Sequence, residues 1–525
     1  MPDMPPLPLS PTAARLDAQL KAAQGHHAPE GHSFHVARIG TGFYFAYEQL
    51  RNAAENREHH LLLRSAIERY LTRYVNLYAY RSAAPDLVTE LTQSGYLKND
   101  SVSMAKLEQI DEILGQYAEL LSEVGTTKTA SRKTVTKWVF QIASGQIEDL
   151  LSSNRRLAIF MGFSYEHYFH AVDAKLAEDL GGTSTQEYQI ALYCAVQRAI
   201  FKSDLATTRY YCLAASLPGL NAESFSHFIK LNFLLDELYQ APPTNRLFRL
   251  VNRYGAPMRI LRELLASDSA TDVDLMSRAD VLSRIKRLCQ KQYSQLNERL
   301  NKRIAKTILF IFITKVLIGV AIEVPYDVVA AGAIAWMPLI INIAFPVVYM
   351  VLLSLRIAPP DRHNTELIAA FIDRILYQDV GAPVEYRVKQ RVNSSSLRAT
   401  FNAVYVVGFL LSFGLLSWLL YRLQFNAVNG FIFFIFLSAV SFLGYRLRQL
   451  PRELAMLDAR QGIIQTLADF LSTPFVKVGY WLSDRYSRLN LVSRILDMMI
   501  EMPLKTTLRL VQQWIGFLRD KQEEI

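Results

Sequence analysis

The sequence predicts an all-α, multi-pass membrane protein with a large soluble helical domain ahead of its membrane segments. Three observations support this fold class. The longest apolar runs lie between Ile304 and Tyr445, and four of them can each cross about 30 Å of hydrocarbon. Elsewhere, apolar residues recur at helical spacing, without the sustained apolar–polar alternation typical of strands. Lysines and arginines gather beside the apolar runs.

The part before the membrane divides into three predicted segments. Residues 1–32 are rich in proline and lack the charged start and apolar core of a signal peptide, so we expect a disordered tail. Residues 33–278 show helical spacing interrupted by proline and glycine, which predicts a soluble all-helical domain of about eight helices. Residues 279–304 form an unbroken amphipathic pattern, and we expect a basic stalk helix that continues into the first span.

Two hairpins make up the predicted membrane part. Hairpin 1 covers 305–355 and hairpin 2 covers 401–445, each with two spans joined by a short tip. A cytoplasmic helical loop, 356–400, connects them, and amphipathic C-terminal helices occupy 446–525. We interpret Glu323-Val-Pro-Tyr-Asp327 as the tight turn of hairpin 1, so we expect its two acids to be exposed.

The distribution of basic residues predicts the orientation. The chain carries a net charge of +9. Its lysines and arginines flank the spans at both termini and in the middle loop, whereas the hairpin tips contain only Arg422. The positive-inside rule then places both termini and the middle loop in the cytoplasm. Because no targeting segment is visible, we expect a bacterial inner (plasma) membrane.

The stalk is the most basic part of the chain. Between Arg278 and Lys306, nine basic residues stand against two acidic ones. Their place next to the first span favours anionic lipid headgroups over nucleic acid as a partner, and a solvated helix face is the alternative. The candidate headgroup contacts are Arg284, Lys286, Arg287, Lys291, Arg299, Lys302, Arg303 and Lys306.

Lys315 stands near the middle of the first predicted span. A charge at that depth costs about 2.5–3.5 kcal/mol on insertion scales, so such residues usually face a bundle interior or an aqueous path. Asn342, Ser412 and Ser438 stand near the middle of the other three spans. The four residues could form an intramembrane polar layer, with Lys315 and Asn342 as its natural pair. This layer serves either an ion or solute path or helix–helix packing.

The C-terminal helices contain two tryptophans suited to a membrane interface, Trp481 and Trp514. The sequence leaves two positions open for these helices: on the membrane surface, or packed against the soluble domain.

Motifs for catalysis or cofactor binding are not found in the sequence. The three cysteines are far apart, which argues against a disulfide framework or a cysteine-based metal site. Glu166, His167 and His170 form E-H-x-x-H, whose histidines lack the spacing of the zinc-protease motif. Gly40-Thr-Gly42 has neither the strand nor the lysine of a phosphate-binding loop. We therefore predict no metal, no cofactor and no nucleic-acid partner.

For function, the sequence favours an integral membrane scaffold or adaptor that presents its helical domain in the cytoplasm. An oligomeric channel or transporter subunit built around Lys315 is the first alternative. A membrane enzyme is the second, although no nucleophile–base pair is visible. We expect the bilayer as a partner. A protein partner bound through residues 33–266 and self-association both remain open.

Overall fold

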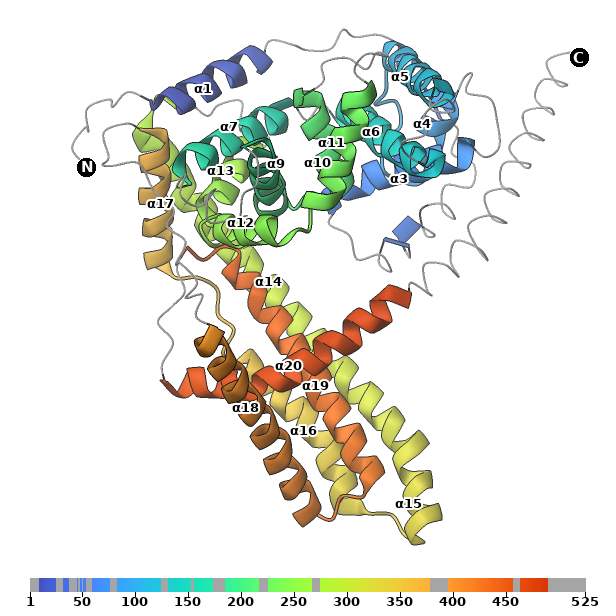
Figure 1. Ribbon diagram of the computed structural model, residues 1–525, viewed down its shortest axis with the longest axis vertical. Helices are drawn as coiled ribbons and strands as arrows, with labels where there is room; N and C mark the ends of the chain where they lie inside the picture. Colours follow the sequence, from blue (N-terminus) through green and yellow to red (C-terminus); the bar gives the residue numbers. More distant parts are fainter. Residues whose placement is uncertain are drawn as a thin grey trace, which may run out of the picture.

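In the computed structural model, a broad helical domain stands on a bundle of long helices (Figure 1). The structure describes residues 9–24, 32–36, 45, 48–49, 51–52, 59–75, 83–123, 131–152, 155–172, 185–216, 225–266, 274–377, 395–456 and 463–489. Within these ranges the chain is all-helical, and the only extended pairings are two isolated bridges, Leu9–Tyr377 and Ser33–Ser103.

In its described part, the upper domain contains two hydrophobic cores. Trp138 and Phe228 are buried in the first core, which also receives residues of α9. The helices that build it, after the 3₁₀ turn η1 (His59–Leu61), are α3 (Leu62–Val75), α4 (Ala83–Gln93), α5 (Met104–Glu123), α6 (Arg132–Ser152), α10 (Leu205–Ser216) and α11 (Phe225–Leu238).

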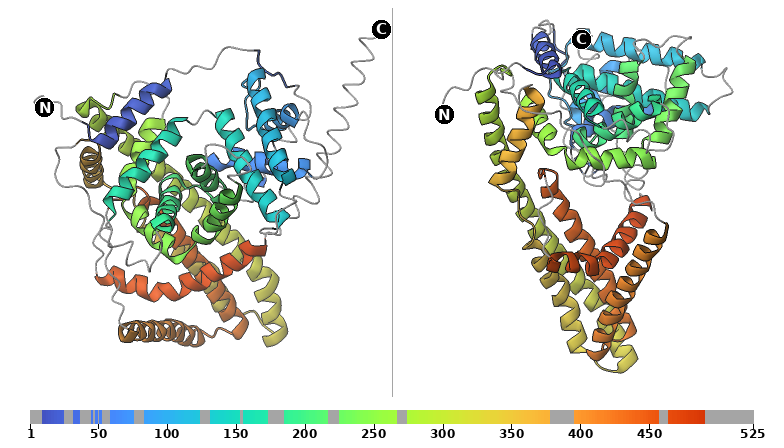
Figure 2. Two further views of the ribbon diagram at one scale, coloured as in Figure 1. Left: turned by 45° about the horizontal axis from the view of Figure 1, so that its top comes forward. Right: turned by 60° about the vertical axis from the view of Figure 1, so that its left-hand side comes forward.

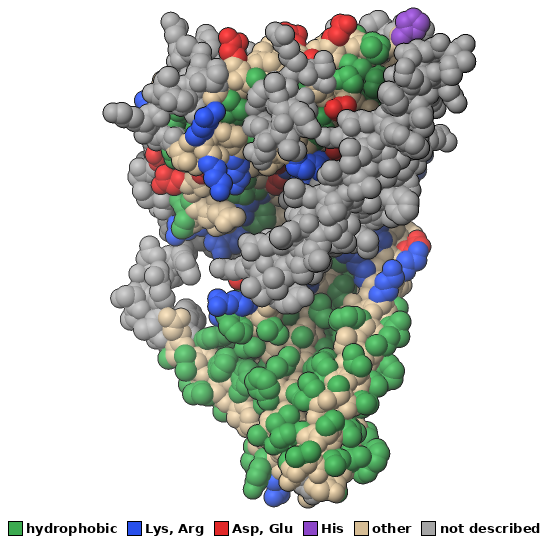
Figure 3. All heavy atoms as spheres, turned by 90° about the vertical axis from the view of Figure 1, so that its right-hand side faces the viewer, with side chains coloured by type: hydrophobic (Ala, Val, Ile, Leu, Met, Phe, Trp, Pro, Cys, Tyr) green, Lys and Arg blue, Asp and Glu red, His purple; other side chains and the backbone are tan. Residues whose placement is uncertain are grey.

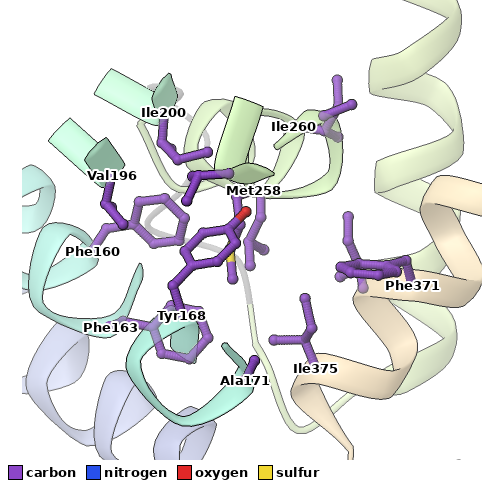
Figure 4. Packing of buried hydrophobic residues seen from close by; sticks show 14 of the residues in the cluster. Phe160, Phe163, Tyr168, Ala171, Val196, Ile200, Met258, Ile260, Phe371 and Ile375 are labelled. Atoms are coloured by element: carbon purple, nitrogen blue, oxygen red, sulfur yellow. The ribbon is translucent and has the colours of Figure 1, made fainter. Parts of the chain in front are cut away.

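The second core lies on the side of the domain that meets the long helices. It brings together residues that lie far apart in the sequence, such as Phe160 and Ile375 (Figure 4). Its elements are α1 (Pro11–Gln24), α7 (Arg155–Ala171), α9 (Thr185–Val196), the π-helical turn η3 (Gln197–Phe201), α12 (Pro242–Arg253), α13 (Ala256–Ala266), the start of α14 (Arg278–Ile318) and α17 (Arg362–Leu376).

Two of these elements differ from the sequence prediction. Residues 1–32 were expected to be a disordered tail, yet α1 is a helix that packs on α7 with Leu16 buried. Helix α17 belongs to the middle loop in sequence. Its Phe371 and Ile375 nevertheless face Tyr168 and Met258 in the second core (Figure 4). Apolar side chains on both helices therefore complete the core of the upper domain.

Helix α14 connects the two parts of the molecule. It runs for 41 residues without interruption, as the stalk pattern predicts. Near its start, Ile285 and Cys289 are buried in the second core; near its end, Ile311 is buried among the long helices. The same helix thus contributes to the packing of both parts.

The turn of hairpin 1 comes later in the chain than the sequence predicts. The helix continues past Ile318 through the π-helical turn η5 (Gly319–Glu323) and α15 (Val324–Ala331), so Glu323–Asp327 is not a turn. Pro325, the second residue of α15, does not end the helix. The true stop is Gly332, whose φ of 70° is left-handed. The second span, α16, covers Trp336–Ser354.

Hairpin 2 consists of α18 (Ser395–Arg422) and α19 (Ala427–Arg452). The chain then returns as α20 (Ile463–Leu489), which crosses the long helices and packs on α18 and α19 (Figures 1 and 2). The sequence left two positions open for the C-terminal helices, the membrane surface or the soluble domain. In the structure, α20 packs against the hairpin helices α18 and α19.

Among the residues that the structure describes, four helices are long and apolar enough to cross a membrane: Arg278–Ala330, Trp336–Ser354, Asn402–Arg422 and Ala427–Arg452. Large apolar side chains such as Leu317, Val329 and Leu410 are exposed on them. Figure 3 shows this apolar surface below, with basic side chains gathered where it meets the upper domain. An exposed apolar band of this kind is a surface for lipid, and the chain is a membrane protein.

Candidate functional site

Lys315 lies beside a carboxylate of its own helical segment. Its Nζ is 2.7 Å from Glu323 Oε1, and both side chains are fully buried. Eight residues separate them, about 12 Å of helix rise, and two long side chains reaching toward each other bridge this distance. The π-helical turn η5 lies between them; such turns are frequent at functional sites. The ammonium also lies 4.6 Å from the centroid of the Phe436 ring on α19.

Asn342 lies on α16 and connects the ion pair to α19. Its Nδ2 donates to Glu323 Oε2 at 2.9 Å and to the Asn429 carbonyl at 3.1 Å. Lys315 and Asn342, the pair expected from the sequence, are therefore connected through Glu323. Each oxygen of the Glu323 carboxylate accepts one hydrogen bond, which offsets part of the cost of burying the charge.

Asp327 makes a second set of contacts one turn further on. Its Oδ1 accepts from Asn426 Nδ2 at 2.7 Å and from Asn429 Nδ2 at 3.3 Å, and its Oδ2 accepts from the backbone N–H of Ala335 at 3.3 Å. The Asn426 side chain also caps α19 by accepting from the Asn429 N–H. These bonds tie the tip of hairpin 1 to the tip of hairpin 2.

We call this group the hairpin cluster. It holds one cation and two carboxylates, all buried, with three amides between them. Its members are Lys315, Glu323, Asp327, Asn342, Asn426 and Asn429.

The expectation that Glu323 and Asp327 are exposed is wrong, because they are 0% and 1% exposed. The physical reason is that the helix continues to Ala331, which turns both carboxylates toward α16 and α19 instead of toward solvent. The signal that sequence reasoning missed was Gly332, the residue that can adopt the left-handed cap. Asn426 and Asn429 were missed because short amides at a tip are typical of any turn.

Ser412 and Ser438, the other two members of the predicted layer, lie at a different contact. Ser412 Oγ donates to the Gly408 carbonyl at 2.8 Å and approaches the Leu471 carbonyl of α20 at 3.2 Å. Ser438 packs against α20 at Gly479, where an added Cβ would lie 2.2 Å from the Ser438 carbonyl oxygen. The predicted layer of four therefore separates into the hairpin cluster and an α20 contact.

The predicted basic residues of the stalk fall into three groups. Arg284, Lys286 and Lys302 pair with acids at 2.7, 2.8 and 2.5 Å, namely Asp280, Glu366 and Glu298. Two others, Arg287 and Lys291, are exposed to solvent. The remaining three line a cavity at the junction of the two parts: Arg299, Arg303 and Lys306.

Two further predicted sites can be placed. Trp481 lies on α20 and is 61% exposed, whereas Trp514 lies outside the described residues. At the E-H-x-x-H motif, Glu166 forms an ion pair with Arg15 of α1. Across the described ranges, no group of three or more histidine, cysteine or acidic side chains is placed to hold a metal ion.

Comparison of the chain with protein-family models, with curated proteins and with solved structures gives no match.

Proposed function

We propose that the protein is a membrane-integral scaffold that holds its helical domain in a fixed position at the cytoplasmic face of the membrane. The observation that supports this most directly is α14, a single helix whose side chains are buried in the second core and again among the long helices. A domain on a flexible linker would move independently of its anchor. A continuous helix packed at both ends fixes the position and orientation of the domain instead.

Two further contacts reinforce this connection. Arg278 binds Asp373 of α17 through two parallel hydrogen bonds, each 2.7 Å long, a geometry that fixes both side chains. Asn364 of α17 also donates to the Leu454 carbonyl and accepts from the Met456 N–H, both at 2.8 Å. The chain segments before and after hairpin 2 are thereby held to the upper domain.

The orientation and location of this scaffold belong to the same proposal. Basic residues lie where α14 and α19 leave the apolar region, at the end that carries the upper domain. By the positive-inside rule this end is cytoplasmic, and a bacterial inner membrane fits the pattern. The proposed partner is a soluble protein that binds residues 33–266.

Affinity purification of the full chain from mild detergent, with mass photometry and mass spectrometry of the eluate, tests the scaffold. The expected result is a stoichiometric soluble protein that remains bound. Phe169→Ser and Phe233→Ser alter exposed aromatic side chains of the upper domain and map the surface; Met276→Ser, exposed but outside 33–266, is the matched control. A closed homo-oligomer without any soluble protein contradicts the scaffold.

A second candidate, an oligomeric channel or transporter subunit, is favoured by one specific observation. Asn342 Oδ1 and Asn429 Oδ1 are buried beside the Lys315–Glu323 pair, and neither accepts a hydrogen bond from the described residues. Free acceptors next to an intramembrane charge are suited to a transported cation or proton. Ion and proton flux in proteoliposomes distinguishes the candidates: Lys315→Met/Glu323→Gln abolishes flux in a transporter, and unchanged flux rejects this function.

A further inference from the structure

The upper domain and the long helices enclose a cavity of about 920 Å³, which we call the junction cavity. Its walls come from α13, α14, α19 and the residues that follow α19. The volume is in the range of small-molecule sites and exceeds what one inorganic phosphate needs. Seven of its lining residues are basic and two are acidic, so the cavity carries a positive charge.

Part of this charge is used within the protein. Lys202 Nζ lies 2.7 Å from Glu453 Oε2, which neutralises one of the two acids. Arg259 donates to the Ala199 carbonyl at 3.1 Å and to the Glu453 carbonyl, and Arg262 donates to the Ile200 carbonyl at 2.7 Å. These bonds build the wall of the cavity on the side of the upper domain, where the second acid, Glu263, also lies.

Four cations remain. Three of them, Arg299, Arg303 and Lys306, are spaced by four and three residues and so share one face of α14. Arg446 approaches from α19. All four are exposed, and none forms an ion pair or hydrogen bond with the residues that the structure describes. Like charges gathered on two helices repel one another, so an anion in the cavity would relieve an unfavourable arrangement.

The position of the cavity indicates the kind of anion. Lys306 is the last basic residue before the apolar run of α14, and Arg446 follows Tyr445 directly where the apolar run of α19 ends. The cations therefore stand at the level at which phospholipid headgroups lie. Figure 3 shows basic side chains at this boundary. Guanidinium groups bind phosphate oxygens through paired hydrogen bonds, which suits arginine to this ligand.

We propose that the junction cavity binds a phosphate-bearing anion, supplied by the headgroup of an anionic lipid, between Arg299, Arg303, Lys306 and Arg446. The site is independent of the scaffold function. It also differs from a general attraction of the basic stalk to the membrane. The ligand is assigned to four residues on two helices, and the other basic residues of the stalk are not part of the site.

The test compares two triple variants of the full chain in nanodiscs of phosphatidylcholine with a minor fraction of phosphatidylglycerol. The cavity variant is Arg303→Gln/Lys306→Gln/Arg446→Gln. The control is Arg287→Gln/Lys291→Gln/Lys302→Gln, which removes the same charge from exposed stalk positions outside the cavity. Native mass spectrometry measures phosphatidylglycerol retained per protein. Retention falls at least about tenfold in the cavity variant and less than about twofold in the control.

A second arm identifies the source of the phosphate. In nanodiscs of phosphatidylcholine alone, calorimetry measures binding of inorganic pyrophosphate. Retained phosphatidylglycerol that only the cavity variant loses supports the site with a lipid ligand. Pyrophosphate binding that only the cavity variant loses, without lipid retention, supports the site with a soluble phosphate compound.

Equal losses in both variants, or no loss in either, overturn the proposal. Gln295→Trp gives an independent check, because this residue lines the cavity and the substitution fills space without changing charge. Lower retention in Gln295→Trp, with an unchanged unfolding temperature, supports an enclosed site. Unchanged retention contradicts one.

Discussion

Charged side chains are arranged in opposite ways at the two ends of the membrane bundle. At the hairpin tips, Lys315 and Glu323 are fully buried and bonded to each other. At the junction with the upper domain, Arg303 and Arg446 are exposed around a cavity and have no partner among the described residues. The difference teaches that a basic residue near a span has two separate uses. A buried and paired cation joins helices, whereas an exposed and unpaired one is available to a ligand.

The largest effect expected is that of removing one partner of the buried pair. Lys315→Leu leaves Glu323 as an uncompensated charge in a dry site, and we expect a loss of about 3–5 kcal/mol. Thermal unfolding in detergent measures it as a lower midpoint. Lys302→Leu is the matched control, because this lysine forms an exposed pair and its loss costs about 0–1 kcal/mol. Equal midpoints for the two variants contradict the comparison.

A steric change at the α20 contact ranks next. Gly479→Ala places a Cβ 2.2 Å from the Ser438 carbonyl oxygen, which forces α20 away from α19 at a cost of about 1–3 kcal/mol. Gly414→Ala on α18 is the control, since nothing lies within 4 Å of its Cβ. Limited proteolysis of α20 reports the displacement. Indistinguishable cleavage of both variants shows that α20 does not pack as described.

Asp327 sharpens the comparison at the tips themselves. Asp327→Ala leaves the amides of Asn426 and Asn429 without their acceptor, and we expect a loss of about 1–3 kcal/mol. Asp327→Asn keeps an acceptor oxygen, so we expect a smaller loss of stability. The unfolding midpoints of the two variants give the order. If alanine is tolerated as well as asparagine, the tips are not joined through this side chain.

The smallest effect is a pH dependence in the upper domain. Burial raises the pKa of Glu148 to about 7, partly opposed by the nearby Arg64 guanidinium. The folded state thus holds a proton that the unfolded state releases near pH 4.5, and this contribution to stability is lost as pH rises toward 7. Glu148→Gln has no titrating carboxyl group, so the variant does not lose this stability as the pH rises.

The variant should therefore match the wild type near pH 4 and exceed it at pH 8, by on the order of 1 kcal/mol because the carboxyl is partly exposed. Unfolding midpoints at the two pH values measure the difference. A constant difference between variant and wild type contradicts the shifted pKa. Burial lowers the pKa of His167 to about 4, so its contribution to stability increases as the pH rises. This contribution is the same in the wild type and the variant and does not affect the difference between them.

Sequence patterns predicted the membrane helices well because hydropathy over a span depends only on local composition. The amphipathic pattern of the stalk helix was also predictable, and Ile285 and Cys289 lie on the buried face of that helix. Where a helix ends and what a side chain faces depend on distant partners. Pro325 suggested a turn that Gly332 makes instead, and nothing local to Phe371 indicates that α17 packs against residues some 200 positions earlier in the chain.

A double-mutant cycle on Lys315 and Glu323 tests most directly whether the hairpin cluster is a packing element. The variants are Lys315→Met, Glu323→Gln and the two combined, compared by unfolding midpoint in nanodiscs. We predict that each single variant is strongly destabilised and that the combined variant, with no buried charge left, recovers most of the loss. Additive losses, or single variants as stable as the wild type, would contradict a paired, buried cluster.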